Sequence, residues 1–241
     1  MRATDAQRIR KIPLFEKLDD GSFEQLIGSG YLQRFPNHVV LLHEGERPDF
    51  LHVLIEGTVE QYAHHGSRET TLSILGPTAT FILAAVILDE PCLKSARTLT
   101  PSQVVLIPAE KVREVFAEDL AFAHACLVEL AARYRAIVKD LKNMRLRTSL
   151  ERLASWILLA DAEAGGTGKF VIPMEKRSLA SQLGMRPENL SRNFAELARY
   201  GVRVSGRTIH IDDMAALTQL AQPDPLIDDP DVSGVVPAKN D

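Results

Sequence analysis

The stretch Arg177-Ser-Leu-Ala-Ser-Gln-Leu-Gly-Met-Arg-Pro-Glu-Asn-Leu-Ser-Arg-Asn-Phe-Ala-Glu-Leu197 predicts two helices joined by a tight turn. Gly184 suits the left-handed conformation that ends a helix. Pro187 fits the first turn of a new helix, where its missing N–H would be unpaired anyway. Apolar residues then recur at steps of four and three, on one helical face: Leu190, Phe194 and Leu197. This is the layout of a helix-turn-helix whose second helix enters the major groove of DNA.

Charge separates this interpretation from its alternative, an ordinary helical hairpin with a solvated outer face. The whole chain has a net charge of −4. Residues 171–211, however, carry seven basic side chains against three acidic ones, whereas residues 212–241 carry seven aspartates against Lys239. A basic patch that coincides with the motif favours phosphate contacts. We therefore expect DNA contacts from Arg177, Arg186, Glu188, Asn189, Ser191, Arg192 and Arg207.

The residues around this motif predict a wing. Lys169–Pro173 is expected to be a short strand, and Val202–Val204, a Ser205-Gly206 turn and Thr208–Ile211 form a hairpin with Arg207 near its tip. Asp212 is expected to cap a last short helix through Leu220. From Gln222 onward Pro, Asp and Gly dominate, which predicts disorder.

A long apolar seam precedes this region. Its members alternate steps of three and four without a break: Leu120, Ala123, Leu127, Leu130, Tyr134, Ile137, Leu141 and Met144. A narrow seam with charged flanks favours a parallel coiled-coil dimer of two copies over packing of the helix on its own domain.

The N-terminal half predicts short helices followed by many strands. Residues 1–30 show helix-like spacing around an Asp19-Asp20-Gly21-Ser22 break that can cap a helix. From Tyr31 to Pro108, short β-rich runs alternate with Gly and Pro, as in an antiparallel barrel or roll. The fold class is therefore α+β.

Composition narrows the function class. The first residues carry no apolar run that could be a signal peptide, and the longest apolar run, Phe81–Leu88, is too short to span a bilayer. Two cysteines, Cys92 and Cys126, form no metal-binding spacing, which favours a reduced, cytoplasmic protein. We find no catalytic triad pattern and no P-loop, so we do not expect an enzyme or a membrane partner.

Three pieces of the sequence together resemble the CRP/FNR family of bacterial transcription regulators. They are the stretch from Glu44-Gly45 to Leu51-His-Val-Leu-Ile-Glu-Gly57-Thr-Val59, the heptad helix, and the Glu-x-x-Ser-Arg pattern of Gly184–Arg192. The resemblance covers about residues 10–221. It implies a cyclic-nucleotide-binding-like β-roll that senses an effector (1–118), a dimerisation helix (119–146), a winged helix-turn-helix (147–221) and a disordered tail (222–241). It also implies a homodimer that binds double-stranded DNA and contacts RNA polymerase.

The same resemblance assigns base readout. Arg192 can donate two hydrogen bonds to a guanine, and Glu188 can accept from a cytosine amine and orient that arginine. Ser191 can contact a base edge. The resemblance implies TTG-like half-sites in an inverted repeat about one helical turn apart. Pro187 stands where some members carry another base-reading side chain, so the outer bases are left open.

The effector pocket departs from the cyclic-nucleotide-binding members. Ile82 and Leu83 stand where those members have a glycine and a ribose-binding glutamate, and Lys94-Ser95 stands in place of Arg-Ser. Each polar group of a nucleotide that is left unpaired in an apolar site costs about 1–3 kcal/mol, so we do not expect cyclic AMP. The four cysteine ligands of an FNR iron–sulfur cluster are absent too.

The recognition helix, the altered pocket and the segment Gln222–Asp228 resemble the nitric-oxide-responsive branch of the family, whose members are thought to sense through haem. The expected pocket residues are Leu83, Lys94, Ser95 and His124, and haem is a candidate cofactor. His124 lies beside the seam, and His64-His65 falls at a hairpin tip. His52 alternates with apolar residues in a strand, so that its ring can face water. The other histidines are His38, His43 and His210. Two alternatives stay open: a cyclic-nucleotide-responsive regulator, and a β-roll ligand-binding module without DNA binding.

Overall fold

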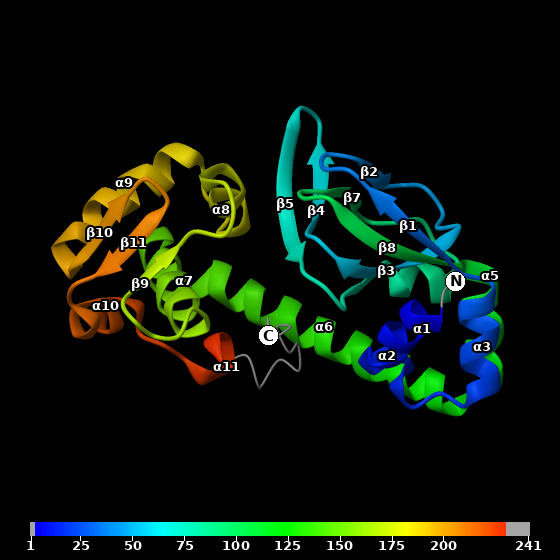
Figure 1. Ribbon diagram of the computed structural model, residues 1–241. Helices are drawn as coiled ribbons and strands as arrows, with labels where there is room; N and C mark the ends of the chain where they lie inside the picture. Colours follow the sequence, from blue (N-terminus) through cyan, green and yellow to red (C-terminus); the bar gives the residue numbers. More distant parts are fainter. Residues whose placement is uncertain (1–2, 230–241) are drawn as a thin grey trace. The chain divides into compact units, whose positions relative to one another are not determined.

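The computed structural model describes residues 3–229 of the 241-residue chain. They belong to two compact units, and the boundary between the units falls between Arg133 and Tyr134. This boundary lies inside one long helix, α6 (Leu120–Leu146), which spans the predicted seam (Figure 1). Each unit has its own apolar core and is described by itself.

Three helices open the first unit: α1 (Ala3–Arg10), α2 (Pro13–Glu16) and α3 (Asp20–Gly28). The Asp19 carboxylate caps α3 by accepting a hydrogen bond from the Ser22 backbone N–H at 2.9 Å, which confirms the predicted helix break. The Phe15 ring stacks on Phe122 of α6, with the ring centroids 6.4 Å apart. This contact ties the N-terminal helices to the first half of α6.

Two antiparallel sheets form the predicted β-roll. The strands are β1 (Tyr31–Phe35), β2 (Val40–Leu42), β3 (Phe50–Glu56), β4 (Val59–His65), β5 (Arg68–Leu75), β6 (Thr80–Phe81), β7 (Ser95–Thr98) and β8 (Ser102–Pro108). One sheet has the order β1-β8-β3-β6 and the other β2-β7-β4-β5. Apolar side chains from both sheets meet in one core cluster: Leu54, Val59, Leu75, Phe81, Ala96 and Val104. The N-terminal helices, α5 (Ala109–Glu118) and the start of α6 contribute to a second cluster with β3 and β8.

Gly57 makes the turn between β3 and β4 possible. Its φ of +93° is rare for residues with a side chain, and a Cβ there would lie 2.6 Å from the Pro101 carbonyl oxygen. The β-roll stretch recognised in the sequence therefore contains a position that only glycine fits.

The second unit begins in α6 and contains the predicted winged helix-turn-helix. Its elements are α7 (Ser149–Glu163), β9 (Lys169–Val171), α8 (Lys176–Gln182), α9 (Pro187–Leu197), a 3₁₀ turn (Ala198–Tyr200), β10 (Val202–Ser205), β11 (Thr208–Ile211), α10 (Met214–Ala221) and α11 (Pro225–Asp228). Thr148 and Glu151 form a capping box at the start of α7. The sheet order is β10-β11-β9, and α7, α8, α9 and α10 share one core with it.

Two details differ from the sequence predictions. Asp213, not Asp212, caps α10: its carboxylate accepts a hydrogen bond from the Ala216 backbone N–H at 2.9 Å. Asp212 is occupied instead by an ion pair with Arg203. The segment 222–229, predicted as disordered, is described and contains α11, whereas the rest of the predicted tail, 230–241, lies outside the described residues.

Within residues 3–229, we find no helix that is both long enough and apolar enough to cross a membrane.

Candidate nucleic-acid interface

The recognition helix α9 has one buried face and one free face. Gly184 has a φ of +61° in the turn before it, and Pro187 is its first residue, both as predicted. Its core-facing side chains are buried: Leu190, Asn193, Phe194 and Leu197. Glu188, Ser191 and Arg192 are exposed. The structure therefore places the three expected base-reading side chains on the free face of one helix.

Asn189 is the side chain that contacts Arg192. The Arg192 guanidinium donates a hydrogen bond to the Asn189 side-chain oxygen, three residues earlier on α9. The sequence resemblance assigns the orienting role to Glu188 instead. Residues three or four positions apart are neighbours on a helix surface. Asn189 is therefore as well placed as Glu188 to contact Arg192. The Ser191 hydroxyl donates to the Pro187 carbonyl oxygen at 3.1 Å.

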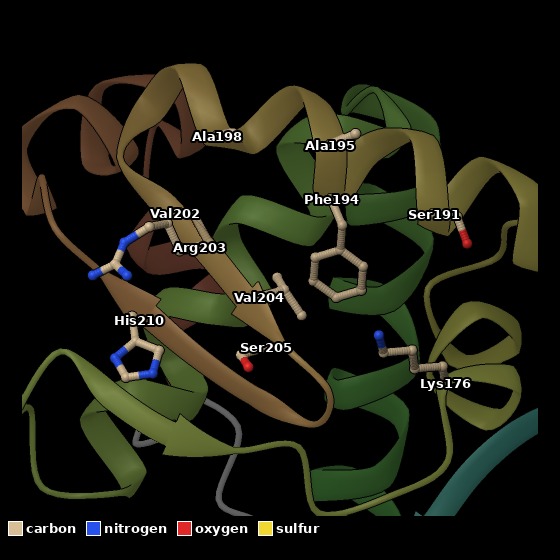
Figure 2. A pocket seen from close by; sticks show the side chains of 10 residues that line it. All are labelled: Lys176, Ser191, Phe194, Ala195, Ala198, Val202, Arg203, Val204, Ser205 and His210. Carbon is tan, nitrogen blue, oxygen red and sulfur yellow. The ribbon is translucent and has the colours of Figure 1, made fainter.

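A groove of about 730 Å³ separates α9 from the wing. Figure 2 shows the Phe194 ring between the Lys176 side chain and the wing strand β10. The Lys176 ammonium lies over this ring, 5.6 Å from its centroid. Ser191 belongs both to the groove and to the free face of α9. The full lining is Lys176, Ser191, Phe194, Ala195, Ala198, Val202, Arg203, Val204, Ser205 and His210.

Three other expected DNA contacts lie outside this groove. Arg177 and Arg186 are exposed, at the start of α8 and just before α9. Arg207, near the wing tip, donates to the Ile172 carbonyl oxygen through Nη2 at 2.7 Å and Nε at 3.2 Å. Its guanidinium therefore braces the wing against the residue that follows β9.

The apolar seam of α6 is largely uncovered. Leu127, Tyr134 and Ile137 expose 65%, 68% and 64% of their surface. Leu120, Leu141 and Met144 are exposed as well. The two remaining members differ: Leu130 packs against the core of the first unit, and Ala123 is half-buried.

The predicted effector segment keeps an unusual backbone. Ile82 has a φ of +64°, a left-handed conformation that a β-branched residue adopts only at a cost of order 1–3 kcal/mol. It immediately precedes α4 (Leu83–Leu88). Leu83 is buried and packs in the core of the first unit. Position 82 thus has a left-handed backbone conformation that suits the glycine of the cyclic-nucleotide-binding members, although the residue here is isoleucine.

Lys94 is the expected pocket residue with the most polar surroundings. Its ammonium donates to the Gln61 side-chain oxygen at 2.7 Å. Burial, and then the nearby Arg133, lower the pKa of Lys94 to about 8. The Gln61 side-chain nitrogen is buried and has no hydrogen-bond partner among the described residues. Gln61 and Arg133 come from β4 and α6, far from Lys94 in sequence, so spacing gave no signal for this cluster.

Of the remaining expected pocket residues, Ser95 is already hydrogen-bonded to the protein backbone and His124 is exposed. The Ser95 hydroxyl accepts a hydrogen bond from the Glu44 backbone N–H at 2.9 Å. His124 lies exposed on α6.

His52 is buried and does not face water. It lies on β3, which is covered on both faces, and its ring is 4.9 Å from that of Phe81. The Nδ1 atom of His52 hydrogen-bonds the Phe50 carbonyl oxygen at 3.1 Å. Burial lowers the pKa of His52 to about 4, so its imidazole is neutral at pH 7.

The candidate haem-ligating histidines lie in different surroundings. His124 is exposed, and His52 is packed against Phe81 in the interior of the roll. His64, at the predicted hairpin tip, lies 3.1 Å from the Glu69 carboxylate. Within residues 3–229, no cluster of three or more His, Cys, Asp or Glu side chains is placed to hold a metal ion.

The chain matches two families of protein domains. Residues 32–119 match the cyclic nucleotide-binding domain, and residues 151–220 match the Crp-like helix-turn-helix domain. The first match covers most of the β-roll. The second begins in α7 and ends in α10.

One relative and two solved structures extend these matches. The chain is 27% identical over 195 residues to a CRP-like cAMP-activated global transcriptional regulator of Mycobacterium tuberculosis, over 78% of this chain and 87% of that protein. FixK2 from Bradyrhizobium japonicum has a similar fold, with a TM-score of 0.66 and 19% identity over 79% of this chain and 96% of that one. DNR from Pseudomonas aeruginosa matches with a TM-score of 0.50 and 24% identity over 91% and 99%.

Proposed function

We propose that the chain is a Crp-like DNA-binding transcription regulator with an effector-binding domain, which the pairing of these two domains supports, and that it acts as a homodimer on an inverted repeat. The observation that carries this proposal is the free face of α9, on which Glu188, Ser191 and Arg192 are exposed beside a buried apolar face. An α-helix of this kind fits the major groove, whose base edges differ for every base pair.

Each side chain has a role that its chemistry supports. Arg192 donates two hydrogen bonds to the O6 and N7 atoms of a guanine, held in position by Asn189. Glu188 accepts from a cytosine amine, and Ser191 contacts a neighbouring base edge. These roles give TTG-like half-sites.

Phosphate contacts come from both flanks of α9. The major groove is about as wide as a helix with its side chains, so the two DNA backbones lie on either side of the helix. The groove between α9 and the wing receives one backbone, where Lys176 and the hydroxyl of Ser205 are available. Arg177 and Arg186 are exposed for further phosphate contacts, and Arg207 adds its charge at the wing.

The exposed seam of α6 supports the dimer. Burying an apolar side chain from water stabilises association by about 25 cal/mol per Å², and Leu127, Tyr134, Ile137 and Leu141 present such surface in a single stripe. A second copy of the same helix, packed in parallel, covers this stripe with matching side chains. Two DNA-binding domains then face two half-sites about one helical turn apart.

The effector binds in the β-roll and shifts the dimer between two states of different DNA affinity. We propose that the effector is not cyclic AMP, although the mycobacterial relative carries that activator in its name. Leu83 cannot accept from a ribose hydroxyl, and the Lys94 ammonium is a point charge rather than the two-pronged donor of an arginine. Calorimetric titration of cyclic AMP into the protein tests this; saturable binding at micromolar concentration would contradict it.

Nitric oxide sensing through haem stays a prediction of the sequence resemblance. Its test is the absorption spectrum of protein from haem-replete cells, before and after nitric oxide. A Soret band that shifts with nitric oxide supports the prediction, and a spectrum without one after reconstitution removes it. We also propose, from the type of regulator alone, contact with RNA polymerase and a place in the cytoplasm.

The alternative is a β-roll ligand module that does not bind DNA, and salt dependence separates the two. Fluorescence anisotropy with a labelled duplex should show affinity falling steeply as salt rises, because bound phosphates release counterions. A protein that shows no DNA affinity even at low salt, with and without cell extract to supply the effector, would favour the alternative.

A further inference from the structure

The last described segment, Gln222–Asp229, is held at the corner between α6 and α7 by Arg147. The Arg147 guanidinium donates to both carboxylate oxygens of Asp228, with Nη1–Oδ1 at 2.7 Å and Nη2–Oδ2 at 2.6 Å. Nη2 also donates to the Gln222 carbonyl oxygen at 3.2 Å. The side chains of Arg147 and Asp228 are only 7% and 11% exposed. A bidentate arginine–carboxylate pair of this kind fixes both the distance between the two side chains and their relative orientation.

The Asp228 carboxylate is fully engaged. It also accepts hydrogen bonds from the Ser155 hydroxyl at 2.8 Å and from the Asp224 backbone N–H at 2.7 Å. Burial opposes ionisation of this group, but the hydrogen bonds from Arg147, Asp224 and Ser155 outweigh it and hold the pKa of Asp228 below its usual value. The carboxylate is therefore charged at neutral pH.

Two lysines of α6 bind the same segment. The Lys139 ammonium donates to the Asp229 carbonyl oxygen at 2.6 Å, and the Lys142 ammonium donates to that of Leu226 at 3.4 Å. Together with Arg147, which follows α6, they hold the segment at successive points along the C-terminal part of α6 and the corner after it.

Arg147 also connects this corner to the turn of the helix-turn-helix. Its carbonyl oxygen accepts a hydrogen bond from Arg152 Nη1 at 2.7 Å, and Arg152 Nε donates to the Leu183 carbonyl oxygen at 2.9 Å. Leu183 directly follows α8 and is its C-cap. The next residue, Gly184, lies against the Met144 side chain of α6, where an added Cβ would overlap the Met144 methyl group. The end of α6, the corner and the turn before α9 thus share direct contacts.

The segment is not needed to complete the core of the second unit. Leu217 and Ala221, both in α10, are the last buried residues of that core, and Leu226 of the segment is 63% exposed. The contacts of Gln222–Asp229 described above are polar and go to α6, Arg147 and Ser155. The segment therefore stabilises the corner between α6 and α7 rather than the apolar core of the domain.

We propose that Gln222–Asp229 is a strap that fixes the recognition helix relative to the C-terminal part of α6, and that Arg147 is the positioning residue through which it acts on DNA binding. This inference rests on DNA recognition by α9. Without the strap, α9 takes several orientations relative to the C-terminal part of α6, and DNA binds only one of them. The affinity then falls by the fraction of molecules in the competent arrangement.

The experiment uses the full chain and a duplex that the wild type selects from a random pool. Asp228→Asn and Arg147→Gln should each weaken DNA affinity about tenfold, and the double variant should lose no more than either one, because the pair acts as a unit. The slope of affinity against salt should not change, since no phosphate contact is removed. Glu163→Gln, which removes an equal charge at the exposed end of α7, should bind like wild type.

Hydrogen exchange supplies a readout that does not depend on DNA. In Asp228→Asn, amides of residues 145–152 and 179–186 should exchange faster, while those of α10 keep their protection. If Asp228→Asn does not fold, Ser155→Ala removes one of the hydrogen bonds to the carboxylate and should give the same pattern with a few-fold loss of affinity. Unchanged exchange and unchanged affinity in a folded variant would overturn the strap, as would tighter binding. Absence of DNA binding by the wild type would overturn the proposed function instead, while the exchange result would still decide whether the strap holds the corner.

Discussion

Arg192 and Asn189 form a hydrogen-bonded pair on the free face of α9, with the guanidinium donating to the side-chain amide oxygen. The pair limits the rotamers of an exposed, flexible side chain before DNA is present. An arginine held in this way loses less entropy when it binds the edge of a guanine. In the proposed readout, specificity therefore depends on Arg192 and Asn189 together rather than on Arg192 alone.

Replacing Arg192 by alanine should remove discrimination at one base pair of each half-site. We expect a loss of about 1–3 kcal/mol, confined to the position of the guanine. Competition binding with duplexes altered at each position measures it. Arg199→Ala, an exposed arginine in the 3₁₀ turn after α9, is the matched control and should leave the base preference unchanged. An Arg192→Ala protein with wild-type preference at every position would refute this readout.

Lys176 should contribute to affinity without contributing to specificity. Lys176→Gln is expected to weaken binding evenly across sequences and to reduce the slope of log affinity against log salt by about one. The reason is that its ammonium lines the groove beside α9, where a DNA backbone would lie. Lys169→Gln on β9 is exposed and lies outside that groove. A larger salt effect from Lys169 than from Lys176 would show that the backbone takes another path.

Ile137→Glu should convert the dimer to monomer. Ile137 is largely exposed in the single chain, so a glutamate there is tolerated by the monomer but places two like charges together in a dimer seam. Sedimentation velocity would show the change in mass, and DNA affinity should fall with it. Ala121→Glu, exposed on α6 outside the stripe, should remain dimeric. A wild-type chain that sediments as a monomer at micromolar concentration would contradict the proposed interface.

Stability should fall as the pH drops from about 6.5 to 4 because of His52. The unfolded chain binds a proton near pH 6.5, whereas burial keeps the folded imidazole neutral down to its pKa of about 4. The folded state is therefore penalised through this window, by a total on the order of 3 kcal/mol, and is unaffected above it. Denaturant melts of wild type and His52→Gln at several pH values isolate this part of the loss. A variant that loses stability as steeply as the wild type would exclude His52 as the cause, and His65→Gln, exposed at the hairpin tip, is the control.

Local signals were enough to predict the helix-turn-helix and the roll. Gly184 and Pro187 mark the turn through the backbone conformations that they favour, and the structure has both as predicted. The seam of α6 follows from side-chain spacing alone, and the helix spans it. These features depend on residues within a few positions of one another.

Features that depend on distant partners could not be predicted. The alternation around His52 indicates one face in water, but Phe81 from β6 covers that histidine. Asp212 has the composition of a helix cap, but Arg203 of β10 takes its carboxylate. Gln222–Asp229 has the composition of a disordered tail, and yet Arg147, 81 positions before Asp228, holds it in place.

Selection from a pool of random duplexes by the wild-type chain tests the central claim most directly. The account predicts enrichment of an inverted repeat with TTG-like half-sites whose centres lie about one helical turn, about 34–36 Å, apart. This result would require the readout by α9 and the two-fold symmetry of the dimer together. Enrichment of single, unpaired sites would contradict the homodimer, and no enrichment in either the presence or absence of cell extract would contradict sequence-specific recognition itself.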